Sequence, residues 1–108
     1  MFISKRCDCN PKTDNCCKSD KDISKLNQIF TVVSVKSRLE ILFLLNSKSH
    51  CVCDITTHTK MSQSLISHHL ADLMKLNLIK GKREGKFIDY YLTEKGKKVV
   101  QALESIIS

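Results

Sequence analysis

Six cysteines are the residues of this 108-residue chain most suited to chemistry. Cys51 and Cys53 form a C-x-C pair in the middle of the chain. The other four lie near the N-terminus, at Cys7, Cys9, Cys16 and Cys17. Thiolates bind soft metal ions, and a trigonal or tetrahedral site needs one or two ligands more than the pair supplies. The N-terminal cysteines could supply them; the alternative for Cys51 and Cys53 is that they are small buried hydrophobic residues.

The spacing of the C-x-C pair limits where it can act. In a regular helix, residues two apart point about 200° away from each other, so both sulfurs converge only where the chain is still irregular. The pair stands at the start of a short segment, residues 51–58, that is rich in threonine and is expected to be a weak helix. We therefore expect the sulfurs to meet at the first turn of that helix.

The charge of the chain favours a polyanionic partner. Eighteen Lys and Arg residues against eleven Asp and Glu give a net charge of +7, which points to nucleic acid. No stretch approaches the roughly 18 apolar residues of a membrane span, and residues 1–9 lack the apolar core of a signal peptide. We expect a cytoplasmic protein without membrane contact.

Apolar periodicity divides the chain into a cysteine-rich arm, residues 1–21, and one domain, residues 22–108. Helices are expected over 23–33, 35–45, 51–58 and 63–76 and from Thr93 to Ile107, and strands over 78–82 and 86–92 with a turn at 83–85. This order predicts a mainly α fold with a small β-hairpin, a winged helix-turn-helix.

Local signals refine these elements. Ser34, Ser62 and Thr93 are expected N-caps, and Asn77 is expected to end the fourth helix in a left-handed conformation. The inner stripe of that helix is expected to be Leu65, Ile66, Leu70, Leu73 and Leu76. The last helix carries a large apolar face formed by Val99, Val100, Leu103, Ile106 and Ile107. Such a face in so small a domain predicts contact with a partner chain.

The fourth helix is expected to read DNA in the major groove. Its outward residues are Gln63, Ser64, Ser67 and His68, and the basic residues Lys82, Arg83 and Lys86 surround the hairpin tip. A glutamine can pair with adenine, serines can donate to phosphates or bases, and basic residues can neutralise phosphates. Each feature alone is typical of a solvated surface, but their order together favours DNA binding.

Three stretches resemble the ArsR/SmtB family of metal-sensing repressors: CVCDI at 51–55, SQSLISHHL at 62–70, and LI at 78–79 followed by REGK at 83–86. The resemblance covers about residues 23–107. It implies a homodimer joined through its first and last helices. It also implies a repressor that leaves its double-stranded operator DNA when metal binds.

Departures from the family pattern narrow the choice of metal ion that the chain is expected to bind. Arsenite sensors of the family typically have a third cysteine where this chain has Thr56, and the last helix lacks the histidine of the zinc, cobalt and nickel sensors. The chain looks most like the cadmium/lead branch, in which arm cysteines complete the site, and Cys7 and Cys9 match best. The resemblance thus implies a soft-metal effector bound by Cys7, Cys9, Cys51 and Cys53. Cadmium or lead is the expected effector, and zinc and arsenite are further candidates. Cys16 and Cys17 could replace Cys7 and Cys9 as arm ligands or join them.

Two other functions are compatible with the residues. The same fold could serve a repressor that responds to thiol oxidation or persulfide through its cysteines. A small thiol enzyme or metal buffer, with a cysteine nucleophile and His50 or His58 as base, is a remote alternative. No Gly-rich phosphate loop or carboxylate pair supports catalysis, so we do not expect an enzyme.

Overall fold

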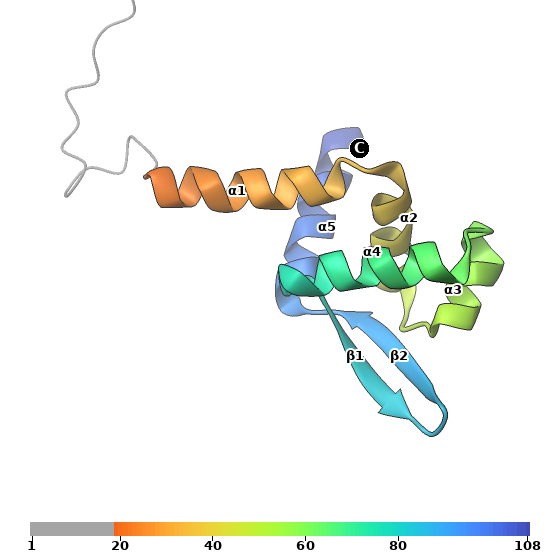
Figure 1. The fold of residues 1–108 in the computed structure, drawn as a ribbon. Helices are drawn as coiled ribbons and strands as arrows, with labels where there is room; N and C mark the ends of the chain where they lie inside the picture. Colours follow the sequence, from red (N-terminus) through yellow and green to blue (C-terminus); the bar gives the residue numbers. More distant parts are fainter. Residues whose placement is uncertain (1–18) are drawn as a thin grey trace, which may run out of the picture.

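The computed structural model describes residues 19–108, and the arm cysteines Cys7, Cys9, Cys16 and Cys17 lie outside this part. Its helices are α1 (Asp20–Val33), α2 (Lys36–Ser47), α3 (Val52–Thr59), α4 (Gln63–Lys75) and α5 (Glu94–Ile107). A hairpin of β1 (Ile79–Glu84) and β2 (Phe87–Leu92) stands between α4 and α5 and projects from the helices (Figure 1). The predicted winged helix-turn-helix, mainly α with one hairpin, is confirmed.

Side-chain caps begin three of the helices. The hydroxyl of Ser62 accepts a hydrogen bond from Leu65 N at 3.2 Å, and that of Thr93 accepts one from Gly96 N at 3.1 Å. Both caps were predicted, because Ser and Thr can satisfy backbone N–H groups that have no partner in the first turn. Ser19 does the same for α1, which begins at Asp20, before the predicted domain start at residue 22.

The predicted cap at Ser34 is wrong. Ser34 ends α1 instead: its N–H donates to Phe30 O at 2.9 Å and its hydroxyl donates to Thr31 O, also at 2.9 Å. Val35 takes the N-cap position of α2 and makes no side-chain cap. The hydroxyl of Ser34 is thus already used by the preceding helix.

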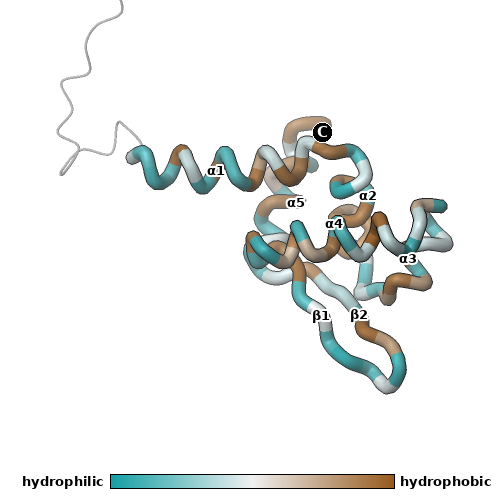
Figure 2. Tube along the Cα trace, viewed as in Figure 1, coloured by the Kyte–Doolittle hydropathy of each residue, from teal (hydrophilic) through white to brown (hydrophobic). Residues whose placement is uncertain are grey.

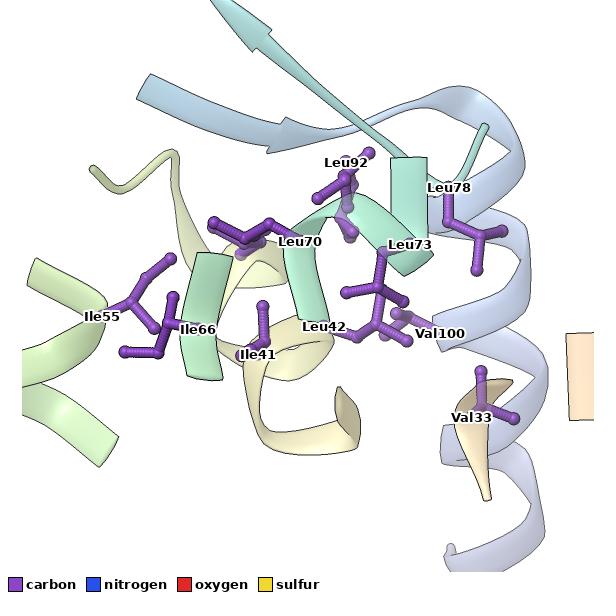
Figure 3. Close-up of a cluster of buried hydrophobic side chains, with 12 residues drawn as sticks. Val33, Ile41, Leu42, Ile55, Ile66, Leu70, Leu73, Leu78, Leu92 and Val100 are labelled. Carbon is purple, nitrogen blue, oxygen red and sulfur yellow. The ribbon is translucent and has the colours of Figure 1, made fainter. Parts of the chain in front are cut away.

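The core lies between α2 and α4 and is closed by the base of the hairpin (Figure 3). Its fully or nearly fully buried side chains are Val33, Ile41, Leu42, Leu45, Ile55, Ile66, Leu70, Leu73, Leu78, Ile79, Leu92 and Val100. On α4 the buried positions are Ile66, His69, Leu70 and Leu73, which follow helical spacing. Leu65 was expected inside but is 41% exposed, because it lies off this stripe and His69 fills the inner position instead.

The hairpin turns later than predicted. Register pairs run from Ile79↔Leu92 to Glu84↔Phe87, so Arg83 and Glu84 belong to β1 and the turn consists of Gly85 and Lys86. Gly85 has φ +61, a positive value that two-residue hairpin turns require at their first position. Asn77, at the end of α4, has φ 59, as predicted for a left-handed helix end.

None of the helices within residues 19–108 combines the length and apolar character that a bilayer crossing requires.

Gly96 allows α5 to lie against the backbone at the start of the hairpin. A Cβ at this position would overlap the carbonyl oxygen of Leu78 and come within 3.3 Å of Leu92 Cδ2. The carbonyl oxygen belongs to the backbone and cannot turn away as a flexible side chain could. The packing of α5 on the hairpin base therefore depends on the absence of a side chain at residue 96.

We expect Gly96→Ala to lower the free energy of unfolding by about 1–3 kcal/mol, because the added methyl group forces α5 away from Leu78. Helix propensity alone predicts the opposite sign, a gain of about 1 kcal/mol. Urea denaturation followed by circular dichroism measures the difference. The pair Gln101→Ala and Gln101→Gly, at an exposed position of α5 outside its apolar face, calibrates the propensity of this helix. A stabilised Gly96→Ala protein would contradict the packing argument.

Candidate functional site

The predicted reading face of α4 consists of Gln63, Ser64, Ser67 and His68. All four side chains are exposed, and with Ala71 they line one open hollow of about 550 Å³. They share this face because Ile66, Leu70 and Leu73 turn the opposite side of α4 into the core. The structure thus brings the four predicted residues together on one outer surface.

The basic residues of the wing, the β1–β2 hairpin, are also exposed. Lys82 and Arg83 lie in β1 and Lys86 lies in the turn. Successive strand residues point to opposite faces, so Lys82 and Arg83 cannot both face the same surface. Lys82 Nζ lies 3.6 Å from Glu84 Oε1 on its own face. The wing therefore offers positive charge on two sides.

A half-buried polar cluster joins α2 to the inner edge of α4. Arg38 Nη2 lies 2.7 Å from Asp72 Oδ2, and Arg38 Nε donates to His69 Nδ1 at 3.2 Å. A further N–H of the guanidinium reaches Val32 O, near the end of α1, at 3.4 Å. No sequence pattern predicts this cluster, because its members are far apart in the chain. It fixes α4 relative to both α1 and α2.

The surroundings of His69 in this cluster favour its neutral form. Burial lowers the pKa of His69 from its usual 6.5, the Arg38 guanidinium lowers it further, and Asp72 only partly opposes them. A neutral ring can accept the Arg38 N–H at Nδ1, whereas a protonated ring cannot. The contact with Arg38 therefore depends on the protonation state of His69.

The C-x-C pair lies where α3 begins. Cys51 is the N-cap of α3, half-buried and with extended backbone (φ −87, ψ 169), whereas Cys53 is exposed in the first turn. Neither forms a disulfide in the described part of the chain. The exposure of Cys53 does not fit the alternative of a small buried hydrophobic residue. Thr56, where a third cysteine would stand, donates its hydroxyl to Val52 O at 2.9 Å.

The pair does not complete a metal site within residues 19–108. No three His, Cys, Asp or Glu side chains in this range gather closely enough to hold an ion. The donors themselves fit a soft ion, since two thiols stand at one helix terminus and one of them reaches solvent. The predicted ligands Cys7 and Cys9 lie outside the described residues, as do Cys16 and Cys17.

His50, the residue before the pair, is 3% exposed. Its Nδ1 lies 2.8 Å from Lys48 O, and its ring meets that of His58 edge to face with centroids 5.5 Å apart. Its backbone pairs with Tyr90 of β2. His50 thus connects the start of α3, the end of α3 and the wing, a role that the sequence did not suggest.

Comparison with known proteins places this geometry in a family. A family model described as "Bacterial regulatory protein, arsR family" matches residues 36–80, from α2 into β1. The cadmium resistance transcriptional regulatory protein CadC homolog of Staphylococcus aureus is 31% identical over 83 residues, which cover 71% of this chain and 69% of that protein. The chain belongs to the ArsR family of bacterial regulatory proteins. The resemblance inferred from its motifs is confirmed.

Two further comparisons agree. The arsenical resistance operon repressor of Staphylococcus aureus is 38% identical over 61 residues, 56% of this chain and 59% of that repressor's length. Among solved structures, HlyU from Vibrio cholerae N16961 matches with a TM-score of 0.75 and 25% identity, over 82% of this chain and 97% of HlyU. The fold described above is therefore that of the ArsR-type regulators.

We expect the free energy of unfolding to decrease as the pH falls below 6.5, because the unfolded chain binds a proton at His69 more readily than the folded chain does. One such proton accounts for at most about 1.4 kcal/mol per pH unit. Urea denaturation between about pH 7.5 and 5.5 measures this slope. His69→Gln should flatten it, whereas His68→Gln at the exposed neighbour should keep most of it. Equal slopes for the two variants would show that His69 is not the responsible group.

Proposed function

We propose that this ArsR-family chain is a metal-responsive transcriptional repressor and not an enzyme. It binds operator DNA as a homodimer and is released when a soft metal ion binds its cysteine thiolates. The observation that carries the proposal is the position of the C-x-C pair at the first turn of α3, the helix that packs directly against the DNA-reading helix α4.

In this proposal α4 enters the major groove of the operator. Gln63 pairs with a base edge, and Ser64 and Ser67 donate to bases or phosphates. His68, on the same face of α4, adds a further contact to the DNA. Lys82, Arg83 and Lys86 of the wing neutralise phosphates beside the groove. A two-fold operator then receives the two α4 helices about 34–36 Å apart, one helical turn of DNA.

The exposed apolar faces of α1 and α5 support the dimer. On α1, Leu26 and Phe30 are 47% and 54% exposed, and at the end of α5 Ile106 and Ile107 are 71% and 82% exposed. Both helices carry stretches of hydrophobic residues, drawn in brown in Figure 2. An entirely apolar hollow of about 110 Å³ lies between the two helices. The free energy falls when a partner surface covers side chains of this kind and removes them from water. A second copy of the chain would cover both faces by two-fold symmetry.

The effector site combines the C-x-C pair with the arm. Thiolates of Cys51 and Cys53, together with Cys7 and Cys9, would hold cadmium or lead, with zinc and arsenite as further candidates. Cys16 and Cys17 are the alternative or additional arm ligands. Such a site ties the arm to α3. The coupling it needs is small, since about 1–3 kcal/mol changes DNA affinity about 5- to 150-fold.

A thiol-redox repressor is the second candidate, and the exposure of Cys53 favours it because an oxidant can reach that sulfur. Both candidates share the fold and the DNA contacts. They differ in whether the response needs a metal ion or an oxidant.

We expect the reduced full chain to bind labelled DNA from just upstream of its own gene, and near-stoichiometric cadmium to weaken binding about 5- to 150-fold. Fluorescence anisotropy measures both. Cys53→Ser should keep the DNA affinity and lose the cadmium response, because the site loses a thiolate, whereas Thr56→Ser on the same helix should keep both. A response to peroxide in chelated buffer, with none to cadmium, would favour the redox candidate. A protein that binds no operator DNA would contradict the repressor.

We expect Phe30→Glu to weaken the dimer by about 2 kcal/mol or more, at least about 30-fold in its dissociation constant, because a charge would be buried in the apolar interface. Sedimentation equilibrium measures the change, and circular dichroism checks that the helices remain. Gln28→Glu adds the same charge on a different side of α1, away from the apolar hollow, and should leave the dimer intact. If Phe30→Glu dimerises as tightly as the unchanged chain, the interface lies elsewhere.

A further inference from the structure

The residue next to the C-x-C pair is part of the sheet of the wing. His50 N donates to Tyr90 O at 3.0 Å, and Tyr90 N donates to His50 O at 2.8 Å. The two residues thus exchange both backbone hydrogen bonds, as an antiparallel hydrogen-bonded pair does. The chain segment that precedes Cys51 is therefore attached to β2.

Tyr90 connects His50 to the other strand of the wing, β1. Its N–H and C=O both serve His50, so its pairing with Gly81 of β1 is of the type without direct hydrogen bonds, in which side chains approach more closely. The Tyr90 ring lies over Gly81, since a Cβ there would be 3.1 Å from Tyr90 Cε1 and 2.8 Å from Ile88 Cγ2. β2 is thus held between His50 on one side and β1 on the other.

His50 itself is fixed on two sides. Its ring nitrogen contacts Lys48 O, before the pair, and its ring contacts His58 in the last turn of α3. On the other side, Cys51 O accepts the N–H of Ile55 as the first hydrogen bond of α3. A change in the backbone of Cys51 must therefore move α3, His50 or both.

α3 is a short helix of eight residues with weak intrinsic helix propensity. Thr56, Thr57 and Thr59 each donate a hydroxyl to the carbonyl four residues earlier, at 2.9, 3.0 and 2.7 Å, and threonine is a weak helix former. Cys51 is extended and half-buried while Cys53 is helical and exposed. An ion bound by both sulfurs would act on this first turn, whereas α4 is anchored by the core and by Arg38.

We propose that His50 is a positioning residue that couples the C-x-C pair to the wing through its paired backbone hydrogen bonds with Tyr90. The inference rests on the proposed metal response. When the thiolates of Cys51 and Cys53 converge, the readjusted first turn of α3 shifts His50 and loosens this pairing. β2 then moves, and with it Lys82 and Arg83, whose cross-strand partners lie within two residues of Tyr90. Metal binding at the cysteines thus changes the position of the wing and not of α4 alone.

Amide hydrogen exchange of the reduced, ¹⁵N-labelled full chain, with and without one equivalent of cadmium chloride, tests the coupling by NMR. The Tyr90 amide donates to His50 O, and the Thr93 amide, which donates to Leu78 O at 3.0 Å at the base of the same hairpin, is the matched control. We expect cadmium to speed exchange at Tyr90 by at least about 5-fold relative to Thr93.

The ultraviolet charge-transfer band of thiolate-bound cadmium, recorded on the same sample, separates the two possible failures. If the band forms but the Tyr90 and Thr93 amides change equally, or not at all, the coupling through His50 is overturned and the metal-responsive repressor stands. If no band forms, cadmium does not bind the thiolates. The metal response is then what has failed, and the coupling is overturned with it.

Discussion

The structure depends on the burial of one side of α4. Ile66, Leu70 and Leu73 pack into a core shared with α2, and this contact fixes the rotation of α4 about its own axis. Because an α-helix has 3.6 residues per turn, the same contact determines which side chains face outward. Ser64 and Ser67 reach solvent together because their neighbours are buried. The surface proposed to read DNA is thus set by apolar packing before any polar contact is made.

The parts of the fold that could be predicted are those fixed by short-range interactions. The caps at Ser62 and Thr93 join residues three positions apart, and the left-handed Asn77 needs only its own side-chain type. Ser34 shows the limit of this reasoning. Its hydroxyl could serve the helix before it or the helix after it, and residue type alone does not decide between two local partners. The outward position of Ser64 and Ser67 could be predicted from periodicity, although the exposed Leu65 shows that periodicity alone does not fix the edge of the core.

The rest of the site needed three-dimensional information. Arg38 meets His69 and Asp72 across 31 and 34 positions, and no local pattern marks such contacts. The same holds for the pairing of His50 with Tyr90, which depends on how the hairpin returns to the loop before α3. Thiol chemistry stays a prediction from residue type and spacing. The contacts around the thiols, such as the pairing of His50 with Tyr90, could not be predicted from the sequence.

Energetic scale favours the wing as the moving part of a sensor built on this fold. Truncation of a single buried aliphatic side chain such as Leu70 lowers the free energy of unfolding by about 2–5 kcal/mol. A response that disrupted the core around α4 would therefore cost more than a regulatory coupling of about 1–3 kcal/mol can supply. Two backbone hydrogen bonds contribute about 0.5–1.5 kcal/mol each. The pairing of His50 with Tyr90 therefore has about the same free energy as the coupling. Loosening it can change DNA affinity while α4 and the core remain in place.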